Sequence, residues 1–200
     1  KTAYEMLRSL VGSEMCIRDS DYLKPGCGYG GSCFPKDVMA LSALSKEISI
    51  SPKIIDAVIE VNDKQPSCMI QMLGNEVEDL WNKHVLILGL AFKPETDDVR
   101  ESVSLKLLNL LSGKVASLRA HDPIAIENTK KIISPAVSVT YVYDWKSKIA
   151  ESDIVIIATN WNVYTEIHEF GDLLSGKIIF DTRSLLDSGT LSGVTYLSIN

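Results

Sequence analysis

The stretch His84-Val-Leu-Ile-Leu-Gly-Leu-Ala-Phe92 decides the fold that this sequence predicts. It is a continuous apolar run led by residues that favour β structure, and such runs are typical of strands buried on both faces of a parallel sheet. A helix is expected to follow over residues 102–112, where Val103, Leu107 and Leu111 fall on one helical face. A strand that leads through a polar loop into an amphipathic helix is the repeating unit of an α/β sheet.

The same alternation continues to the end of the chain. We expect further strands at residues 115–121, 138–142, 153–158, 178–181 and 195–199, and helices at 127–133 and 145–151. Strands and helices joined by short connections predict a doubly wound parallel sheet with right-handed crossovers. In such a sheet ligands bind beyond the carboxyl ends of the strands, where Asp122, Asn160 and Arg183 are expected here.

Two helices are expected before the sheet. The first begins near Pro35, whose missing N–H does no harm in a first turn, and it runs to about Lys46. The second begins at Ser51-Pro52, an N-cap followed by proline, and continues to about residue 80 with Pro66 as a kink or break. The fold class is therefore α/β, a Rossmann-like doubly wound sheet preceded by a helical segment that joins two domains or forms a subunit interface.

The composition is that of a soluble globular protein, with 46% hydrophobic and 23% charged residues among 200. Twenty lysines and arginines against 26 acidic residues leave a net charge of −6, which argues against a nucleic acid as the main partner. No apolar run reaches the roughly 18 residues of a membrane span, and no signal peptide is recognisable. Four scattered cysteines predict reduced thiols and a cytoplasmic location.

A glycine loop, Lys24-Pro-Gly-Cys-Gly-Tyr-Gly-Gly-Ser-Cys33, precedes the first helix. Four glycines within six positions permit positive φ angles and close approach of the backbone to a ligand. Cys33 would then stand at a helix amino end, where the partial positive charge and the nearby Lys36 favour the thiolate. A thiolate is a good nucleophile towards a carbonyl carbon, but most free cysteines are structural and buried. On these residues alone both interpretations stay open.

Metal binding is not expected. Cys27 and Cys33 are separated by five residues, which is wider than the usual spacing of a zinc pair, and no second pair of ligands lies nearby. The three histidines, at positions 84, 121 and 168, are far apart and are interpreted as structural or surface residues.

A second candidate group follows the strand at residue 84. The segment Phe92-Lys-Pro-Glu-Thr-Asp-Asp-Val-Arg-Glu-Ser102 opens a helix, which is where anions bind. Lys93 and Arg100 could hold a phosphate or a carboxylate, or the charges of the loop could pair with one another. The turn at residues 89–92 is not G-x-G-x-x-G, so this domain is not expected to be the main NAD site.

Arg183 and Trp161 are each open to two interpretations. Arg183, in Asp181-Thr-Arg183 at a strand end, could clamp an anionic ligand or cap the edge of the sheet. Trp161 could stack on a base or pack in the core.

Three segments together resemble the UDP-glucose/GDP-mannose dehydrogenase family: residues 25–37, 89–102 and 180–183. The resemblance runs from about residue 22 to the end. It implies a three-part chain, with a Rossmann domain that binds NAD, a long central helix that makes a dimer, and a Rossmann-like domain that binds the nucleotide sugar. The resemblance implies three regions here: an atypical and foreign stretch at 1–20, the cysteine loop and central helices at 21–81, and the UDP-sugar-binding domain at 82–200.

The resemblance also implies a reaction, the two-fold oxidation of a sugar C6 alcohol to a carboxylate with two NAD. Cys33 would be the nucleophile that captures the aldehyde, and Asp37 would help to activate water and handle protons. Lys36 and Arg100 would contact NAD. The implied substrate contacts are Lys24, Gly26, Gly28, Tyr29, Gly30, Phe92, Lys93 and Arg183.

UDP-glucose is the substrate that the resemblance favours, because the amino-acid sequence of the cysteine loop is most similar to that of the UDP-glucose branch of the family. GDP-mannose or a UDP-N-acetyl-hexosamine, a non-catalytic nucleotide-sugar-binding module and a cysteine-dependent transferase are the alternatives. The expected partners are the nucleotide sugar and, in the full-length protein, further copies in a homodimer or higher oligomer. The 200 residues alone are expected to be inactive, since the resemblance places the NAD domain before them. The mechanism requires that the Cys33 sulfur face a cleft whose far wall carries Lys93.

Overall fold

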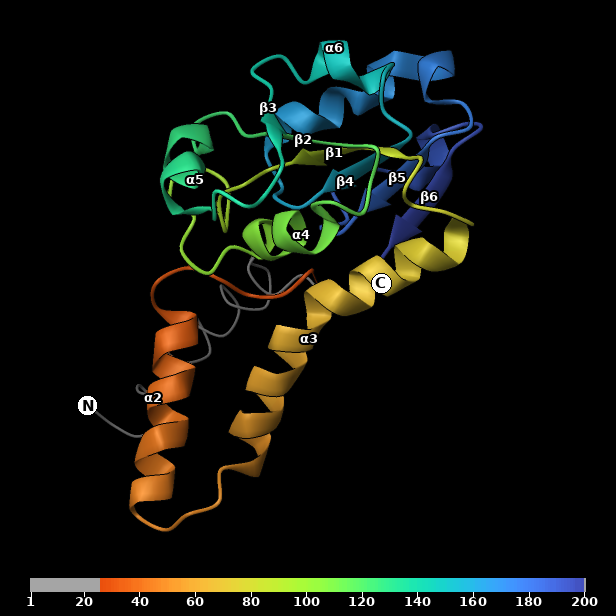
Figure 1. Ribbon diagram of the computed structural model, residues 1–200. Coiled ribbons are helices and arrows are strands. Elements are labelled where there is room, and N and C mark those ends of the chain that lie inside the picture. The colour runs from red at the N-terminus through yellow and green to blue at the C-terminus, as the bar shows by residue number, and fades with distance from the viewer. Residues whose placement is uncertain (1–25, 200) are drawn as a thin grey trace, which may run out of the picture.

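The computed structural model describes residues 26–199, which form a parallel sheet with helices on both faces and a pair of helices that projects from it (Figure 1). The predictions made for residues 1–20 and for Lys24 lie outside this range. The six strands are β1 His84–Leu88, β2 Ser117–His121, β3 Thr140–Tyr141, β4 Ile154–Ile157, β5 Ile178–Asp181 and β6 Thr195–Ser198. Their order in the sheet is β3-β2-β1-β4-β5-β6, and every neighbouring pair is parallel.

This order confirms the doubly wound sheet. The chain starts in the middle at β1, adds β2 and β3 on one side, and then crosses back to add β4, β5 and β6 on the other. The strand order reverses between β1 and β4, and their register pairs Leu88 with Ile157 at the carboxyl ends. A crevice for ligands is expected at this switch point.

Alternate residues of the strands build two apolar cores, one on each face of the sheet. Val85 and Ile87 of β1 join one core, whereas Leu86 and Leu88 join the other, because successive side chains of a strand point to opposite faces. The first core is covered by α4 (Val103–Leu111), α5 (Ile126–Ile132) and the last part of α3 (Lys53–Glu76). The second core is covered by α6 (Lys146–Ile149) and η2 (Asn162–Leu174). A short turn, η3 (Ser188–Thr190), precedes β6.

The helix α2 (Phe34–Glu47) and the first half of α3 form the projecting pair, here called the helical pair (Figure 1). Asp56 of α3 holds the two helices together, because it accepts hydrogen bonds from Ser42 Oγ at 2.6 Å and from Lys46 Nζ at 2.9 Å. Pro66 lies inside α3 without ending it, and the ribbon bends within this helix, as expected where proline removes a backbone donor.

The predicted elements are present, with shifted ends. Pro52, not Ser51, occupies the N-cap position of α3, and the strand expected at 138–142 is only β3. The structure also contains η2, which the sequence did not indicate. Among residues 26–199, no helix is both long enough and apolar enough to cross a membrane.

Candidate functional site

The described part of the glycine loop, residues 26–33, runs between α3 and the segment that follows β1. Gly28 has φ +119° and Gly31 has φ +85°, conformations that side chains other than glycine rarely adopt. A Cβ on Gly30 would lie 2.3 Å from the carbonyl oxygen of Glu101. Glycine is therefore required here both for the turn and for the close approach.

The glycine loop meets the second sequence motif directly. The amide of Gly31 donates a hydrogen bond to the carbonyl oxygen of Arg100 at 2.8 Å. The ring of Phe92 packs so closely against Gly31 that a Cβ there would come within 2.7 Å of it. Two segments that are about 60 residues apart in the chain are thereby in contact at the carboxyl end of β1.

Cys33 lies at the N-cap position of α2, with Pro35 in the first positions of the helix and Asp37 in the first turn. Its thiol is exposed, so it is not a structural core cysteine, unlike Cys27, which is buried with its sulfur 3.8 Å from the carbonyl oxygen of Ala158. Asp37 lies 3.3 Å from the ammonium group of Lys36, and both side chains are largely exposed. An exposed pair of this kind contributes little to stability, and its carboxylate stays accessible.

The thiol opens into a hollow of about 410 Å³, here called the cysteine hollow. It is lined by Cys33, Phe34, Asp37, Val38 and Leu41. Lys93 is not among the described residues that line it, so the prediction that the Lys93 loop forms the far wall is wrong for this hollow. The contacts between the two segments lie at Gly31, which meets Phe92 and Arg100 two residues before Cys33.

A second hollow of about 560 Å³ lies on the other side of the glycine loop, and we call it the basic hollow. Lys36 and Arg100, the two residues predicted to contact NAD, both line it, together with Ser32 and Lys106. The guanidinium of Arg100 makes a bidentate contact to Asp98, with Nη2 2.7 Å and Nε 2.9 Å from its carboxylate oxygens. These hydrogen bonds hold the pKa of Asp98 below its usual value.

Phe92 and Lys93 lie on the β1–α4 loop, residues 89–102, which buried side chains hold in place. Asp122 Oδ2 accepts hydrogen bonds from the amides of Leu90 at 2.7 Å and Ala91 at 3.1 Å. Ser102 Oγ donates to the carbonyl oxygen of Leu90 at 2.7 Å, and Thr159 Oγ1 donates to that of Ala91 at 2.6 Å. These contacts hold the backbone rigidly just before Phe92, while the Lys93 side chain is exposed, with Nζ 5.5 Å from the Phe92 ring centre.

Arg183 follows β5 and lies beside the start of the glycine loop. Its Nε donates to the carbonyl oxygen of Ala158 at 2.8 Å, and Asp181 accepts from its backbone amide at 3.0 Å. A Cβ on Gly26 would lie 2.7 Å from Arg183 Nη1. The third sequence motif therefore joins the first two at one edge of the sheet.

The chain matches two sequence profiles. Residues 86–188 match the UDP binding domain of the UDP-glucose/GDP-mannose dehydrogenase family, and residues 4–64 match its central domain. The chain belongs to the UDP-glucose/GDP-mannose dehydrogenase family.

Individual members of this family are similar over most of the chain. The UDP-glucose 6-dehydrogenase of Rickettsia conorii is 36% identical over 179 residues, 88% of this chain and 41% of the relative. The structure of a UDP-glucose dehydrogenase from the archaeon Pyrobaculum islandicum matches with a TM-score of 0.74 at 36% identity, over 86% of this chain and 38% of that one. A GDP-mannose dehydrogenase ternary complex from Pseudomonas aeruginosa matches with a TM-score of 0.75 at 25% identity, over 98% and 45%. The chain spans about two fifths of the length of the curated relatives it matches.

Trp161 and His121 of this dehydrogenase family member are both buried and hydrogen-bonded. Trp161 is buried and donates from Nε1 to Asp122 at 3.2 Å, so it packs in the core and is not free to stack on a base. His121 is buried against Tyr164, with Nδ1 2.9 Å from the hydroxyl oxygen, and burial lowers the pKa of its imidazole. Among residues 26–199, no three His, Cys, Asp or Glu side chains are grouped as metal ligands would be.

Sequence reasoning missed the residues that hold these loops. Asn62 and Thr159 carry no motif of their own, and each acts through a hydrogen bond to backbone far away in the sequence. Ser102 ends the second motif, but its hydrogen bond to Leu90 was not predicted. Only Asp122, followed by proline after a predicted strand, stood at a position where a ligand-side residue was expected. A polar residue at a strand end or inside an apolar helix is the signal that could have found the others.

Proposed function

We propose that these residues are the nucleotide-sugar half of an NAD-dependent UDP-glucose 6-dehydrogenase, which oxidises C6 of UDP-glucose twice to give UDP-glucuronate. The observation that carries the proposal is the contact between the glycine loop and the β1–α4 loop. That contact puts an exposed thiol at a helix amino end beside the switch point of a UDP binding domain. Similarity to UDP-glucose 6-dehydrogenases at about 35% identity supports the choice of substrate.

Cys33 is the proposed nucleophile. Its thiolate adds to the C6 aldehyde formed in the first oxidation, and the new S–C bond gives a thiohemiacetal. Oxidation of that carbon leaves a thioester, which water attacks to release the carboxylate and the thiolate. Asp37, in the same hollow, is the proposed acceptor of the proton from this water.

NAD is implied by the family. The positive charges of Lys36 and Arg100 suit its diphosphate. Two cations in one hollow beside the glycine loop would attract a diphosphate, which would compete with Asp37 for Lys36 and with Asp98 for Arg100. The turn after β1 does not suit it, because a Cβ on Gly89 would lie 2.4 Å from Thr159, whose side chain fills the turn. When bound, NAD accepts the hydride that leaves C6 in each oxidation. These residues therefore border the cofactor, and its main site belongs to another part of the protein.

Substrate binding is proposed at the junction of the three motifs. Lys93 and Arg183 would neutralise the diphosphate, and Phe92 with the backbone of Gly26 to Gly30 would enclose the sugar and nucleotide. Lys24 is proposed as a further contact. The exposed ammonium group of Lys93 is not paired with any carboxylate of residues 26–199 within 4 Å, so it is available to an anionic ligand.

Isothermal titration of the 200-residue chain with UDP-glucose, GDP-mannose and UDP tests this proposal. We expect UDP-glucose to bind more tightly than GDP-mannose, and no NADH to form when NAD is added. Lys93→Ala should weaken UDP binding about tenfold, the value of one charge-assisted contact. Lys114→Ala, at the opposite end of the strands, is the matched control and should bind as the parent does. Tighter binding of GDP-mannose, or no binding of any nucleotide sugar, would contradict the substrate assignment.

The full-length protein is proposed to be a cytoplasmic homodimer or higher homo-oligomer. The free thiols of Cys27, Cys33 and Cys68 support a reducing compartment. The apolar side chains exposed on the helical pair support association with a further protein surface.

A further inference from the structure

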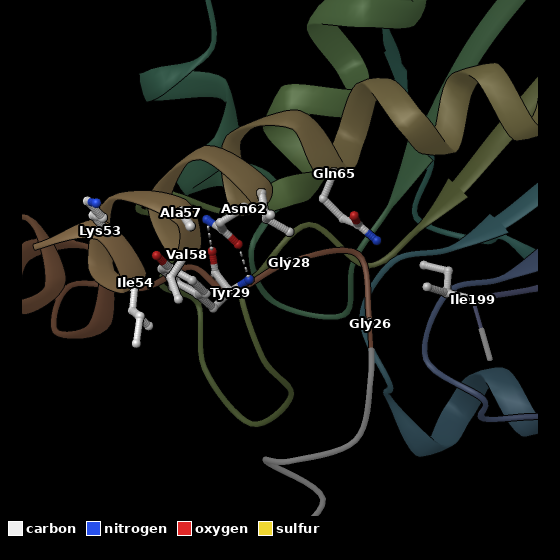
Figure 2. A pocket seen from close by; sticks show the side chains of 11 residues that line it. Gly26, Gly28, Tyr29, Lys53, Ile54, Ala57, Val58, Asn62, Gln65 and Ile199 are labelled. Carbon is white, nitrogen blue, oxygen red and sulfur yellow. Dashed lines mark hydrogen bonds between the residues drawn. The ribbon is translucent and has the colours of Figure 1, made fainter.

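The side chain of Asn62, on α3, faces the backbone of one residue of the glycine loop, as Figure 2 shows. Asn62 Oδ1 accepts a hydrogen bond from the amide of Tyr29 at 2.8 Å. Asn62 Nδ2 donates to the carbonyl oxygen of the same residue at 3.2 Å. Because both backbone groups of Tyr29 are held by one amide, the loop can neither slide along α3 nor rotate at this residue.

Gly28 makes this contact possible. Its φ of +119° bends the loop towards the helix, and a Cβ there would lie 2.8 Å from Asn62 Oδ1. A side chain at position 28 would therefore push Tyr29 away from the helix. The hydrogen bond between Asn62 and Tyr29 therefore requires glycine at position 28.

The other side of the loop is held by the sheet domain. The hydrogen bond from Gly31 to the Arg100 carbonyl lies two residues after Tyr29, and Cys33 follows two residues later. The ring of Tyr29 also lies 5.5 Å from that of Phe34, the first residue of α2. The path of the chain into Cys33 is thus set by one anchor on α3 and one on the β1–α4 loop.

We infer that Asn62 is a positioning residue that holds the Cys33 loop in register with the Phe92–Lys93 segment. It acts through the backbone of Tyr29 and does not itself touch the reacting atoms. The effect on substrate rests on the proposed function, whereas the effect on the geometry of the loop does not.

The test compares two variants of α3 in the 200-residue chain. Asn62→Leu keeps a side chain of similar size and removes both hydrogen bonds. Asn62 and Tyr29 line a pocket of about 650 Å³ between α3 and the glycine loop, and Gln65 lines it too (Figure 2). Gln65→Leu is the matched control, because Gln65 lies one turn further along α3 and makes no hydrogen bond to Tyr29. The readout is the exchange rate of single backbone amides, measured by NMR on isotope-labelled protein. Gly31 reports the second anchor, and Leu86 in the core of β1 reports the global fold.

We expect Gly31 to exchange about tenfold faster in Asn62→Leu, since two hydrogen bonds of ordinary strength are lost, while Leu86 keeps its rate. Gln65→Leu should match the parent at both amides. An unchanged Gly31 rate in a folded Asn62→Leu protein would overturn the inference. If that variant does not fold, Asn62→Ala replaces it, because it removes both hydrogen bonds and adds neither bulk nor charge. It should show a similar increase in the Gly31 rate, and no increase would likewise overturn the inference.

UDP-glucose affinity is the second readout, and we expect Asn62→Leu to weaken it about tenfold while Gln65→Leu leaves it unchanged. An unchanged affinity in a folded Asn62→Leu protein would overturn the part of the inference that concerns the substrate. If the parent binds no UDP-glucose, the proposed function fails, and the Gly31 exchange rates still decide whether Asn62 positions the loop.

Discussion

At the scale of single residues, Asp122 holds the largest share of the site together. Its carboxylate is 2% exposed and accepts hydrogen bonds from four backbone amides and from Trp161 Nε1. The five donors come from the loops after β1, β2 and β4. A buried carboxylate held only by neutral donors depends on all of them, because any donor that is lost leaves charge without compensation.

We therefore predict that Asp122→Asn destabilises the fold more than its small change in size suggests. The amide has one acceptor fewer, so its NH2 group must face backbone donors, at a cost of about 2–3 kcal/mol. Urea unfolding should show a lower midpoint with an unchanged slope. Asp172→Asn, on the exposed surface of η2, is the control and should unfold as the parent does. A variant that unfolds at the parent's midpoint would show that the network tolerates the amide.

At the scale of elements, the N-cap residue of α4, Ser102, makes two hydrogen bonds. Ser102 caps the helix by accepting from the Ser104 amide at 3.3 Å, and its hydroxyl hydrogen is donated to Leu90. We predict that Ser102→Ala lowers the free energy of unfolding by about 1–2 kcal/mol, the usual range for a lost N-cap. Thermal unfolding followed by circular dichroism measures this. Ser67→Ala, exposed in the middle of α3, should change the midpoint little, and equal shifts in both variants would argue against the cap.

Elements were predictable from the sequence where one physical signal dominated. The runs that form β1, β4 and β5 are apolar except for His84 and Asp181 at their ends, because both faces of these strands are buried, and the sequence predicts their positions within a few residues. The helix η2 was not predicted, since Gly171, at φ 46°, interrupts its periodic pattern. The strand expected at residues 138–142 is longer than β3, which has only two residues. An edge strand pairs with one neighbour only and needs few paired residues.

The site was predictable to a similar degree. Cys33, Phe92 and Arg183 stood out through glycine-rich or strand-end contexts, and the fold brings their segments together. Asn62 and Thr159 did not stand out, because they act through hydrogen bonds to backbone that is distant in the sequence. Such contacts exist only once the tertiary structure has formed, and the sequence shows at most a polar residue at a strand end or inside an apolar helix, without its partner.

At the scale of the whole molecule, the helical pair exposes more apolar surface than a free helix hairpin should. Leu41 and Leu44 of α2 and Ile48 at its C-cap recur at helical spacing and are each about half exposed, at 49%, 55% and 60%. On α3, Ile54 and Val61 are exposed at 79% and 63%. Exposed apolar side chains that recur along one face of a helix are typical of a contact with another protein surface. The sheet domain, by contrast, buries most of its apolar residues in its own two cores, and its exposed ones, such as Ile124 and Leu173, lie on separate segments.

The last prediction follows from this difference. We expect the chain to self-associate through the helical pair, with a sedimentation coefficient that rises with protein concentration. Leu44→Glu places a charge in the middle of the α2 stripe, and desolvating that charge in an interface is costly, so the variant should stay monomeric at every concentration. Leu173→Glu, equally exposed at 57% but on η2, should associate as the parent does. A parent that sediments as a monomer throughout would assign this face to contacts within one longer polypeptide instead of contacts between copies.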